Sequence, residues 1–550
     1  MNKIKPKFFS VMKTYTKEQF LKDIIAGIIV ALIALPLSIA LAIASGVSPE
    51  QGLYTAIFAG FFIAFLGGSR VQIGGPTAAF VVIVYGIHEQ YGMPGLTVAT
   101  LMAGVILIIM GFLHFGSLIK YIPYTITTGF TAGIAIGIFA GQIKDFLGLS
   151  IEKQPSEFIE KMEKIFSSID TVNTDTLIIG VISLAILIIM PKLSKIIPGS
   201  IVAIVIATLI NELTALDAAT IGSTFGELSS SIPAPELPDV SFSMVRELLP
   251  SAFTIAILAG IESLLSCVVS DGMINSRHRS NMELIGQGVG NIASGLFGGI
   301  PATGAIARTA ANVKNGGRTP VAGMVHAVVL LLILKFLMPY AGMIPMTTLA
   351  AILIIVAYNM ADWKEFFGLC KHAPKSDVIV MLVTFFLTVI FDLVVAIEVG
   401  IVVASLLFIK RMSDVSSVRN WTYINGYDDN PENDPMHICL KVVPEHTLVY
   451  EIDGPMFFGA ADNFLNISIT EETRVVILRM RSVPAMDISA LHALEKVYDI
   501  CQNKNVTLVL SHVNEQPMHM MEKAGFVDKI GEQNFRENID AALEWASQLV

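Results

Sequence analysis

The stretch SAFTIAILAGIESLLS, residues 251–266, is uncharged except for Glu262. Residues 298–313 follow with GGIPATGAIARTAANV, a short run rich in Gly and Ala that carries Arg308. A charge placed in the hydrocarbon of a membrane costs about 2.5–3.5 kcal/mol on insertion scales, and such residues usually serve a function. The two charges therefore indicate a membrane protein that transports a charged solute.

Composition separates the chain into a membrane part and a soluble part. Of its 550 residues, 53% are hydrophobic and 15% are charged, whereas soluble domains carry roughly 25% charged residues. Apolar runs end near Lys410, and the sequence after them has ordinary polarity. We therefore expect a cytoplasmic N-terminal segment (1–22), a transmembrane domain (23–410), a linker (411–435) and a C-terminal domain (436–550).

The composition also argues against several classes of protein. The net charge of −10 argues against nucleic acid as a partner. The four cysteines are far apart and form no CxxC pair, so we expect neither a disulfide framework nor a metal site. Neither part contains a catalytic constellation or a phosphate-binding loop, which argues against an enzyme.

Fourteen segments are predicted to enter the membrane. A helix needs about 20 residues to cross roughly 30 Å of hydrocarbon. Two of the segments, 76–88 and 303–313, are shorter and rich in Gly, Ala and Thr. The others are, in chain order, 23–43, 52–66, 94–113, 122–140, 176–190, 197–213, 248–270, 283–297, 318–338, 345–360, 376–392 and 394–409.

The distribution of Lys and Arg predicts the orientation, because cytoplasmic loops carry more of these residues. Placing the Lys-rich N-terminus in the cytoplasm puts most other basic loops there too, and puts the loop 214–247 outside. An even number of crossings then returns the C-terminal domain to the cytoplasm. We expect a multi-pass protein of the inner (plasma) membrane, surrounded by lipid, with both termini cytoplasmic.

The two short segments form a hidden repeat. Residues 67–68 (GG) lead to GPTA at 75–78, and residues 298–299 (GG) lead to TGAI at 303–306. In the predicted topology they enter from opposite sides, and paired interrupted segments of this kind indicate a transporter binding site. Their helix N-termini, each with about half a positive charge, would together hold an anion. The alternative is that small residues only permit close helix packing.

Glu262 and Arg308 each have two interpretations. Glu262 is either a coupling group that binds a proton or cation, with Ser266 as a further oxygen ligand for Na⁺, or a protonated carboxyl bonded to a neighbouring helix. Arg308 either contacts the anion or pairs internally with Glu262. An ion pair between Glu262 and Arg308 that breaks when the anion or the proton binds would combine the internal pairing with the coupling role.

The residues after Met436 alternate between strand and helix patterns. Residues 446–452, 474–480 and 506–511 have strand character, and residues 489–503 and 518–524 have helical character. This alternation predicts a small α/β domain.

The chain as a whole resembles the SulP family of anion transporters, and its C-terminal part is similar to STAS domains. The resemblance rests on LP at 35–36, VSPEQGLY at 47–54, GGSR at 67–70 with GPTA at 75–78, and the segment around Glu262. It implies an α-helical polytopic fold of 7+7 inverted repeats, arranged as core and gate domains. It also implies elevator-like movement, a homodimer and a cytoplasmic STAS domain.

The resemblance also implies residue roles. Glu262 matches the acidic position used for ion coupling. Sodium-coupled bicarbonate members have Asp there and lack the Arg, so this chain is more like proton-coupled dicarboxylate or sulfate members. The implied substrate positions are Thr77, Ala78, Ala79, Phe80, Ala305, Ile306, Ala307 and Arg308.

Ser489, in the STAS-like part, matches the serine that is phosphorylated in related antagonists. It is a candidate regulatory residue, and the domain is a candidate site for a cytoplasmic protein partner. The alternative is that Ser489 is the N-cap of the following helix.

Four functions remain for comparison. The leading hypothesis is a secondary active transporter of a small anion (sulfate, a dicarboxylate or bicarbonate), with H⁺ or alternatively Na⁺ as coupling ion and no further cofactor. An uncoupled anion channel would show flux without a coupling ion. A nucleobase permease of the same fold would lack the STAS domain, and a sensor acting through that domain would show negligible flux.

Overall fold

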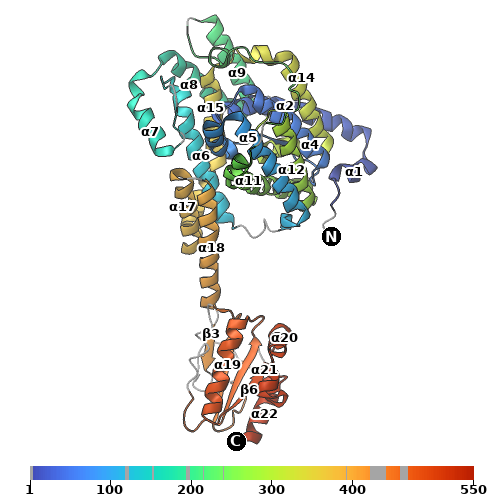
Figure 1. The fold of residues 1–550 in the computed structure, drawn as a ribbon, viewed down its shortest axis with the longest axis vertical. Helices are drawn as coiled ribbons and strands as arrows, with labels where there is room; N and C mark the ends of the chain where they lie inside the picture. Colours follow the sequence, from blue (N-terminus) through green and yellow to red (C-terminus); the bar gives the residue numbers. More distant parts are fainter. Residues whose placement is uncertain are drawn as a thin grey trace. The chain divides into compact units, whose positions relative to one another are not determined.

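The structure is a computed structural model that describes residues 4–117, 123–151, 154–155, 157–193, 198–214, 216–238, 241–391, 393–415, 417–420, 441–458 and 469–550. The chain divides into two compact units, Met1–Ile401 and Val402–Val550, and the boundary falls inside the helix α18 (Leu393–Val415), which begins in the first unit. The first unit contains the apolar helices, and the second contains a five-stranded sheet with helices (Figure 1).

The first unit is helical apart from one pair of two-residue strands among its described residues. Its elements are α1 (Lys7–Val11), η1 (Met12–Thr14), α2 (Lys17–Ala44), α3 (Pro49–Tyr54), η2 (Thr55–Ala59), α4 (Gly60–Leu66), β1 (Gly74–Gly75), η3 (Ala78–Phe80), α5 (Val81–Phe112), α6 (Tyr124–Leu147), α7 (Phe158–Ser167), η5 (Ile169–Thr171), α8 (Thr174–Leu193), α9 (Gly199–Leu213), α10 (Ile221–Phe225), α11 (Phe242–Ile274), α12 (Ser280–Leu296), β2 (Thr303–Gly304), α13 (Ile306–Lys314), α14 (Pro320–Ala341), α15 (Met346–Ala361), α16 (Trp363–His372), α17 (Lys375–Ile390) and α18 (Leu393–Val415).

Each of the fourteen predicted segments overlaps a helix. Within the described residues, eight runs are long and apolar enough to cross a membrane. The predicted segments 76–88 and 94–113 lie in one run that is broken at Gly92, whose φ of 64° is readily adopted only by glycine. Pro36, by contrast, lies inside helix α2, which continues through it.

The helices of the first unit pack in two groups. In one group, α11 and α12 pack on α5, α4 packs on α12, and α14 packs on α2 and α4. In the other, α6 packs on α15 and α17, and α8 packs on α9 and α15. Figure 1 shows α6, α7, α8 and α17 on one side of this unit and α4, α12 and α14 on the other. Each group combines helices from both halves of the membrane sequence, as the predicted core and gate domains do.

Glycines permit a close helix contact in the first group, between α5 and α12. A Cβ added at Gly288 would lie 2.5 Å from the carbonyl oxygen of Gly104, and one added at Gly104 would lie 2.7 Å from that of Gly288. Membrane helices associate by such close packing, because lipid supplies no hydrophobic force between them.

The second unit is an α/β domain. Its elements are β3 (Ser417–Asn420), β4 (Thr447–Asp453), β5 (Val475–Ser482), α19 (Ile488–Asn503), β6 (Thr507–Ser511), α20 (Glu515–Lys523), α21 (Phe526–Ile530), η10 (Glu532–Asn534), β7 (Phe535–Arg536) and α22 (Ile539–Leu549). The strand order is β3-β4-β5-β6-β7; β3 is antiparallel to β4 and the other pairs are parallel.

Side chains alternate between the two faces of this sheet. Val475 and Ile477 of β5 pack with α22, whereas Val476 and Leu478 pack with the helices α19 and α21. A strand covered on both faces is apolar at every position, which explains the run VVIL that begins β5.

Two predicted boundaries in this region differ from the structure. The predicted linker 411–435 begins with the end of α18 and includes β3, and its remaining residues lie outside the described ones. The helix predicted at 518–524 begins at Glu515 instead, because Pro517 is tolerated in a first helical turn.

Candidate functional site

The two short segments meet through their backbones. β1 and β2 pair antiparallel, with Gly74 opposite Gly304 and Gly75 opposite Thr303, and the N–H of Ala305 donates to the carbonyl of Ile73 at 2.9 Å. A Cβ at Gly75 would lie 2.5 Å from Arg308 Nη1, so glycine is required for this approach. The prediction that the two halves of the repeat come together is confirmed.

A helix begins directly after each strand. η3 starts at Ala78 and continues into α5, and α13 starts at Ile306; neither start has a side-chain cap. The first N–H groups of a helix have no partner within it and attract anions. At the second start Ile306 is 43% exposed and Ala307 is also exposed, whereas Ala78, Ala79, Phe80 and Ala305 are buried.

Glu262 lies beside the first helix start. It is carried by α11 and is partly exposed, and the hydroxyl of Thr77 donates to its Oε2 at 3.0 Å. Thr77 is the N-cap residue of η3. The structure thus joins the acidic residue in the apolar helix to the predicted anion site.

Arg308 lies behind the strand pair. Its side chain is buried, with 2% exposed, and Nη2 donates to the carbonyl of Pro76. Nε and Nη1 have no hydrogen-bond partner among the described residues. The guanidinium therefore supplies positive charge next to Gly75 from inside the bundle, away from the exposed side chains of Ile306 and Ala307.

Ser266 belongs to a buried polar cluster. It is 1% exposed and donates to Oε1 of Gln72 at 3.0 Å. Nε2 of Gln72 donates to the carbonyl of Ser263, and the Ser263 hydroxyl accepts from the N–H of Gly304 at 3.0 Å. These bonds attach both broken segments to α11. Sequence reasoning missed Gln72, although an amide beside the Gly-rich motif was a visible signal.

Sequence reasoning also did not identify two buried carboxylates, Glu283 and Asp23, that hold loops in place. Oε2 of Glu283 accepts from the N–H groups of Gly68 at 2.8 Å and Ser69 at 2.9 Å. Asp23 accepts from the hydroxyl of Thr319 at 2.5 Å and from the N–H of Arg318 at 2.9 Å. Both are completely buried. Glu283 fixes the loop 68–69 that follows α4, and Asp23 fixes the loop 318–319 that precedes α14. Both helices belong to the group that contains α5 and α11, which carry the candidate site.

In the second unit, the interpretation of Ser489 as an N-cap is wrong. α19 begins at Ile488, and its cap is Asp487, whose Oδ1 accepts from the N–H of Ala490 at 2.9 Å. Oδ2 of Asp487 accepts from the N–H of Phe458 at 3.0 Å. Ser489 therefore lies in the first helical turn with its side chain exposed.

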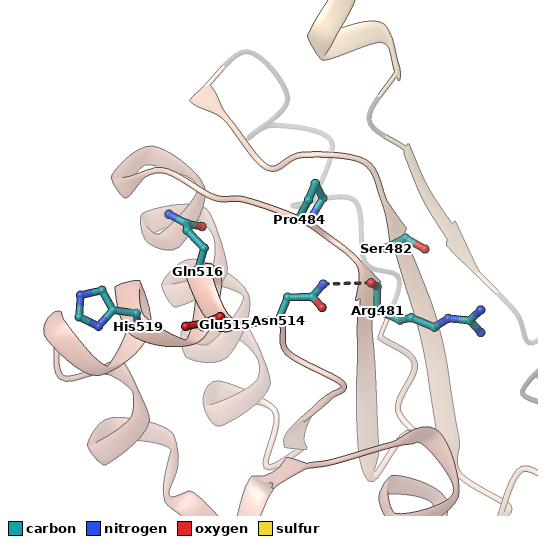
Figure 2. Close-up of a pocket in the computed structure, with 7 residues that line it drawn as sticks. All are labelled: Arg481, Ser482, Pro484, Asn514, Glu515, Gln516 and His519. Carbon is teal, nitrogen blue, oxygen red and sulfur yellow. Dashed lines mark hydrogen bonds between the residues drawn. The ribbon is translucent and has the colours of Figure 1, made fainter. Parts of the chain in front are cut away.

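A pocket of about 750 Å³ lies at the carboxyl end of β5, between this strand and α20 (Figure 2). Figure 2 shows Glu515 and His519 on the helix and Arg481 on the strand. Asn514 donates to the carbonyls of Arg481 at 3.0 Å and Val483 at 2.7 Å. The amide thus holds the loop after β5, which leads to Asp487.

Comparisons with known proteins agree with both units. The sequence profile of the Sulfate permease family matches residues 20–384, and that of the STAS domain matches residues 439–542. YvdB of Bacillus subtilis, which has a provisional sulfate-transporter name, is 40% identical over 538 residues, 97% of this chain and 99% of its own. The bicarbonate transporter BicA of Picosynechococcus is 32% identical over 514 residues, 91% of this chain and 90% of its own.

Solved structures share the fold. Murine Slc26a9, an anion transporter in the inward-facing state, superposes with a TM-score of 0.88 at 19% identity and covers 99% of this chain and 94% of its own. The transmembrane domain of a cyanobacterial BicA gives 0.63 at 30% identity, covering 71% and 98%.

The two short helices that begin at Ala78 and Ile306, here called the broken helices, lie in a unit of apolar helices, and the family match and relatives place this unit in the class of anion transporters. The chain belongs to the sulfate permease (SulP) family and ends in a STAS domain. The matching proteins are transporters and not enzymes.

Proposed function

We propose that this chain is a secondary active transporter that moves a small anion together with a proton. The anion lies at the starts of η3 and α13, and Glu262 is the coupling carboxyl. The observation that carries the proposal is the 3.0 Å hydrogen bond from Thr77 to Glu262, because it joins an ionisable group to the N-cap residue of a broken helix.

Electrostatics links the two ligands in this arrangement. An ionised Glu262 repels an anion at the neighbouring helix start, and a proton on the carboxyl removes that repulsion. The anion and the proton therefore increase each other's affinity, since linkage is reciprocal. Carrying both in one cycle is symport.

The surroundings of Glu262 support a proton in preference to Na⁺. The Thr77 hydroxyl donates to Glu262, whereas the hydroxyl of Ser266, the candidate sodium ligand, is directed towards Gln72. Arg308 acts through its charge in this proposal: Nε and Nη1 have no hydrogen-bond partner among the described residues, so an anion nearby would stabilise the buried guanidinium.

The two helix groups support an elevator mechanism, in which the group with the broken helices moves against the other. Sulfate and bicarbonate are candidate substrates because relatives are named for them, and a dicarboxylate is a third candidate from the sequence resemblance alone. We further propose a homodimer with both termini in the cytoplasm, and Ser489 as an exposed regulatory residue of the STAS domain.

Uptake into proteoliposomes tests the coupling. Labelled sulfate, succinate and bicarbonate are supplied separately, with an inward proton gradient, an inward sodium gradient or neither. We expect one of them to accumulate only with the proton gradient. Glu262→Gln removes the titrating group, so accumulation should fall to the level without a gradient while exchange of internal for external anion continues.

Glu247→Gln is the matched control, because Glu247 is an exposed carboxyl on the same helix. This variant should accumulate substrate as the wild type does. Full gradient-driven accumulation by Glu262→Gln would refute the coupling role. Rapid flux that ignores every gradient in the wild type would show an anion channel instead.

A further inference from the structure

The segment before α2 is fastened to two loops of the broken-helix group. The N–H of Lys7 donates to the carbonyl of Gly67 at 3.0 Å, and its Nζ donates to the carbonyl of Arg277 at 2.7 Å. Arg279 donates from Nη1 to the carbonyl of Lys5 at 2.8 Å and from Nη2 to the hydroxyl of Ser10 at 3.0 Å. All these acceptors are neutral, so the bonds leave the positive charges uncompensated.

Three cations lie near this point: Lys7, Arg70 and Arg279, here called the basic triad. The N–H of Arg279 donates at 3.0 Å to the carbonyl of Gly68, two residues before Arg70, and the charges of both arginines act on Lys7. None of them forms an ion pair with a carboxylate among the described residues. The nearby Asp271 is bonded to the ring and the N–H of His278, at 2.8 and 2.6 Å. Nε of Arg70 is buried and has no partner within the described part of the chain.

The charges of the triad act on one another. Burial lowers the pKa of Lys7, and the charges of Arg279 and Arg70 lower it further, against the opposite effect of Asp271. A partly buried cluster of like charges is unfavourable by itself. An anion bound among the three side chains would relieve the repulsion and satisfy the free N–H of Arg70.

The N-terminal segment that carries Lys7 also exposes apolar side chains, from Ile4 before α1 and from Phe9 within it. Ile4 and Phe9 are 42% and 45% exposed. The rings of Phe8 and Phe9 pack against Phe65 of α4, with centroids 5.1 and 5.8 Å apart. Exposed aromatic and aliphatic groups beside cations are typical of a segment that lies in the interface of a membrane.

We propose that the basic triad binds the phosphate of an anionic phospholipid headgroup, with Ile4 and Phe9 against the acyl chains. The bound lipid then joins the N-terminal segment to Gly67–Arg70, which leads into the first broken helix, and to the loop before α12. This proposal requires only that the chain spans a membrane, and it is independent of the coupling role of Glu262.

Thermal unfolding of the full-length protein in detergent tests the site. The probes are dioctanoyl phosphatidylglycerol, dioctanoyl phosphatidylcholine and inorganic phosphate, each titrated separately. We expect phosphatidylglycerol to raise the melting temperature saturably and the other two to have little effect. A cation near a membrane surface contributes about fivefold in affinity, so Lys7→Gln and Arg70→Gln should each weaken binding by about that factor.

Arg277→Gln is the matched control, because this exposed residue contributes only its carbonyl to the cluster; its affinity should stay unchanged. Arg279→Gln is avoided because Arg279 makes three side-chain hydrogen bonds to the N-terminal segment. Lys7→Gln removes one side-chain hydrogen bond of that segment, so Arg70→Gln is the more decisive variant. Equal stabilisation by phosphatidylcholine would show general solvation by lipid and overturn the proposal. Equal stabilisation by inorganic phosphate would show a site for the free ion, and unchanged affinity in both triad variants would place the lipid elsewhere.

Discussion

At the scale of single residues, the three carboxylates Glu262, Asp23 and Glu283 of the membrane unit have two kinds of surroundings. Glu262 and Thr77 form a bond at a partly exposed position beside a helix start. Asp23 and Glu283 are completely buried and accept several hydrogen bonds from loop backbone. The first kind is available to ligands and the second holds the scaffold, so their substitution should have different consequences.

Asp23→Ala should lower stability. Asp23 accepts from Thr319 Oγ1, from Arg318 N and from Tyr15 at 3.0 Å, and these donors would lose a charged acceptor in a buried place. Such losses cost about 3 kcal/mol. The melting temperature of the purified protein in detergent measures the effect.

Glu18→Ala is the control for that comparison. Glu18 is on the same helix and pairs with Lys22 at 2.6 Å, but its side chain is 79% exposed. Exposed pairs contribute about 0–1 kcal/mol, so its melting temperature should scarcely move. Equal losses in the two variants would contradict the scaffold role of Asp23.

The sequence revealed Glu262 and Arg308 because an isolated charge in an apolar run is conspicuous. Asp23 and Glu283 stand at the first positions of predicted spans, where a charge is ordinarily a boundary residue facing water. Their burial depends on loops more than 200 residues away in the chain, namely 318–319 and 68–69. Local pattern carries no information about such partners.

At the scale of elements, hydropathy located the helices but not their contacts. All fourteen segments are present because the length and polarity of each are local properties. The two-residue pairing of Gly74 with Gly304 depends on three-dimensional approach, and the repeat predicted only that the segments would meet. Asp487 and Ser489 are both good capping residues, so sequence alone could not choose between them.

Gly288→Ala should weaken the packing of α5 on α12. The new methyl group would lie 2.5 Å from the Gly104 carbonyl oxygen and 2.6 Å from Ile108 Cγ1, so the helices must separate. Overpacking of this kind costs about 1–3 kcal/mol, and a lower melting temperature in detergent should report it.

Gly86→Ala is the matched control on α5, because an added Cβ there meets no atom within 4 Å. Alanine favours a helix more than glycine does by about 1 kcal/mol. The melting temperature of this variant should therefore stay the same or rise. If Gly288→Ala behaved in the same way, the close crossing of the two helices would be refuted.

At the scale of the whole molecule, the proposed orientation predicts which side each loop faces. Glu227 is exposed in the loop after α10, and Cys370 is exposed on α16. In a Cys439→Ser background, Glu227→Cys should react with a membrane-impermeant maleimide on intact cells. Cys370 should react only after permeabilisation, and its labelling on intact cells would reverse the topology.

The remaining described cysteines give little background in that experiment. Cys267 and Cys501 are buried, and burial raises the pKa of Cys501 to about 11. Because the thiolate is the reactive form, Cys501 stays unreactive near neutral pH while the domain is folded. Labelling at Cys501 therefore reports unfolding of the STAS domain. Because the pKa of this thiol is higher in the folded state than in the unfolded state, protonated Cys501 stabilises the fold below about pH 9. This contribution to the free energy of unfolding is lost as the pH rises from about 9 to 11.

The backbone pairing of β1 with β2 has an evolutionary consequence. In the proposed site the positive helix ends belong to peptide groups, which no side-chain substitution other than proline removes. Selection can therefore vary the side chains at the rim, such as Ile306 and Ala307, without dismantling the attraction itself. In that site, changes at the rim should alter which anion is carried and leave the attraction in place, and relatives are named for two different oxyanions, sulfate and bicarbonate.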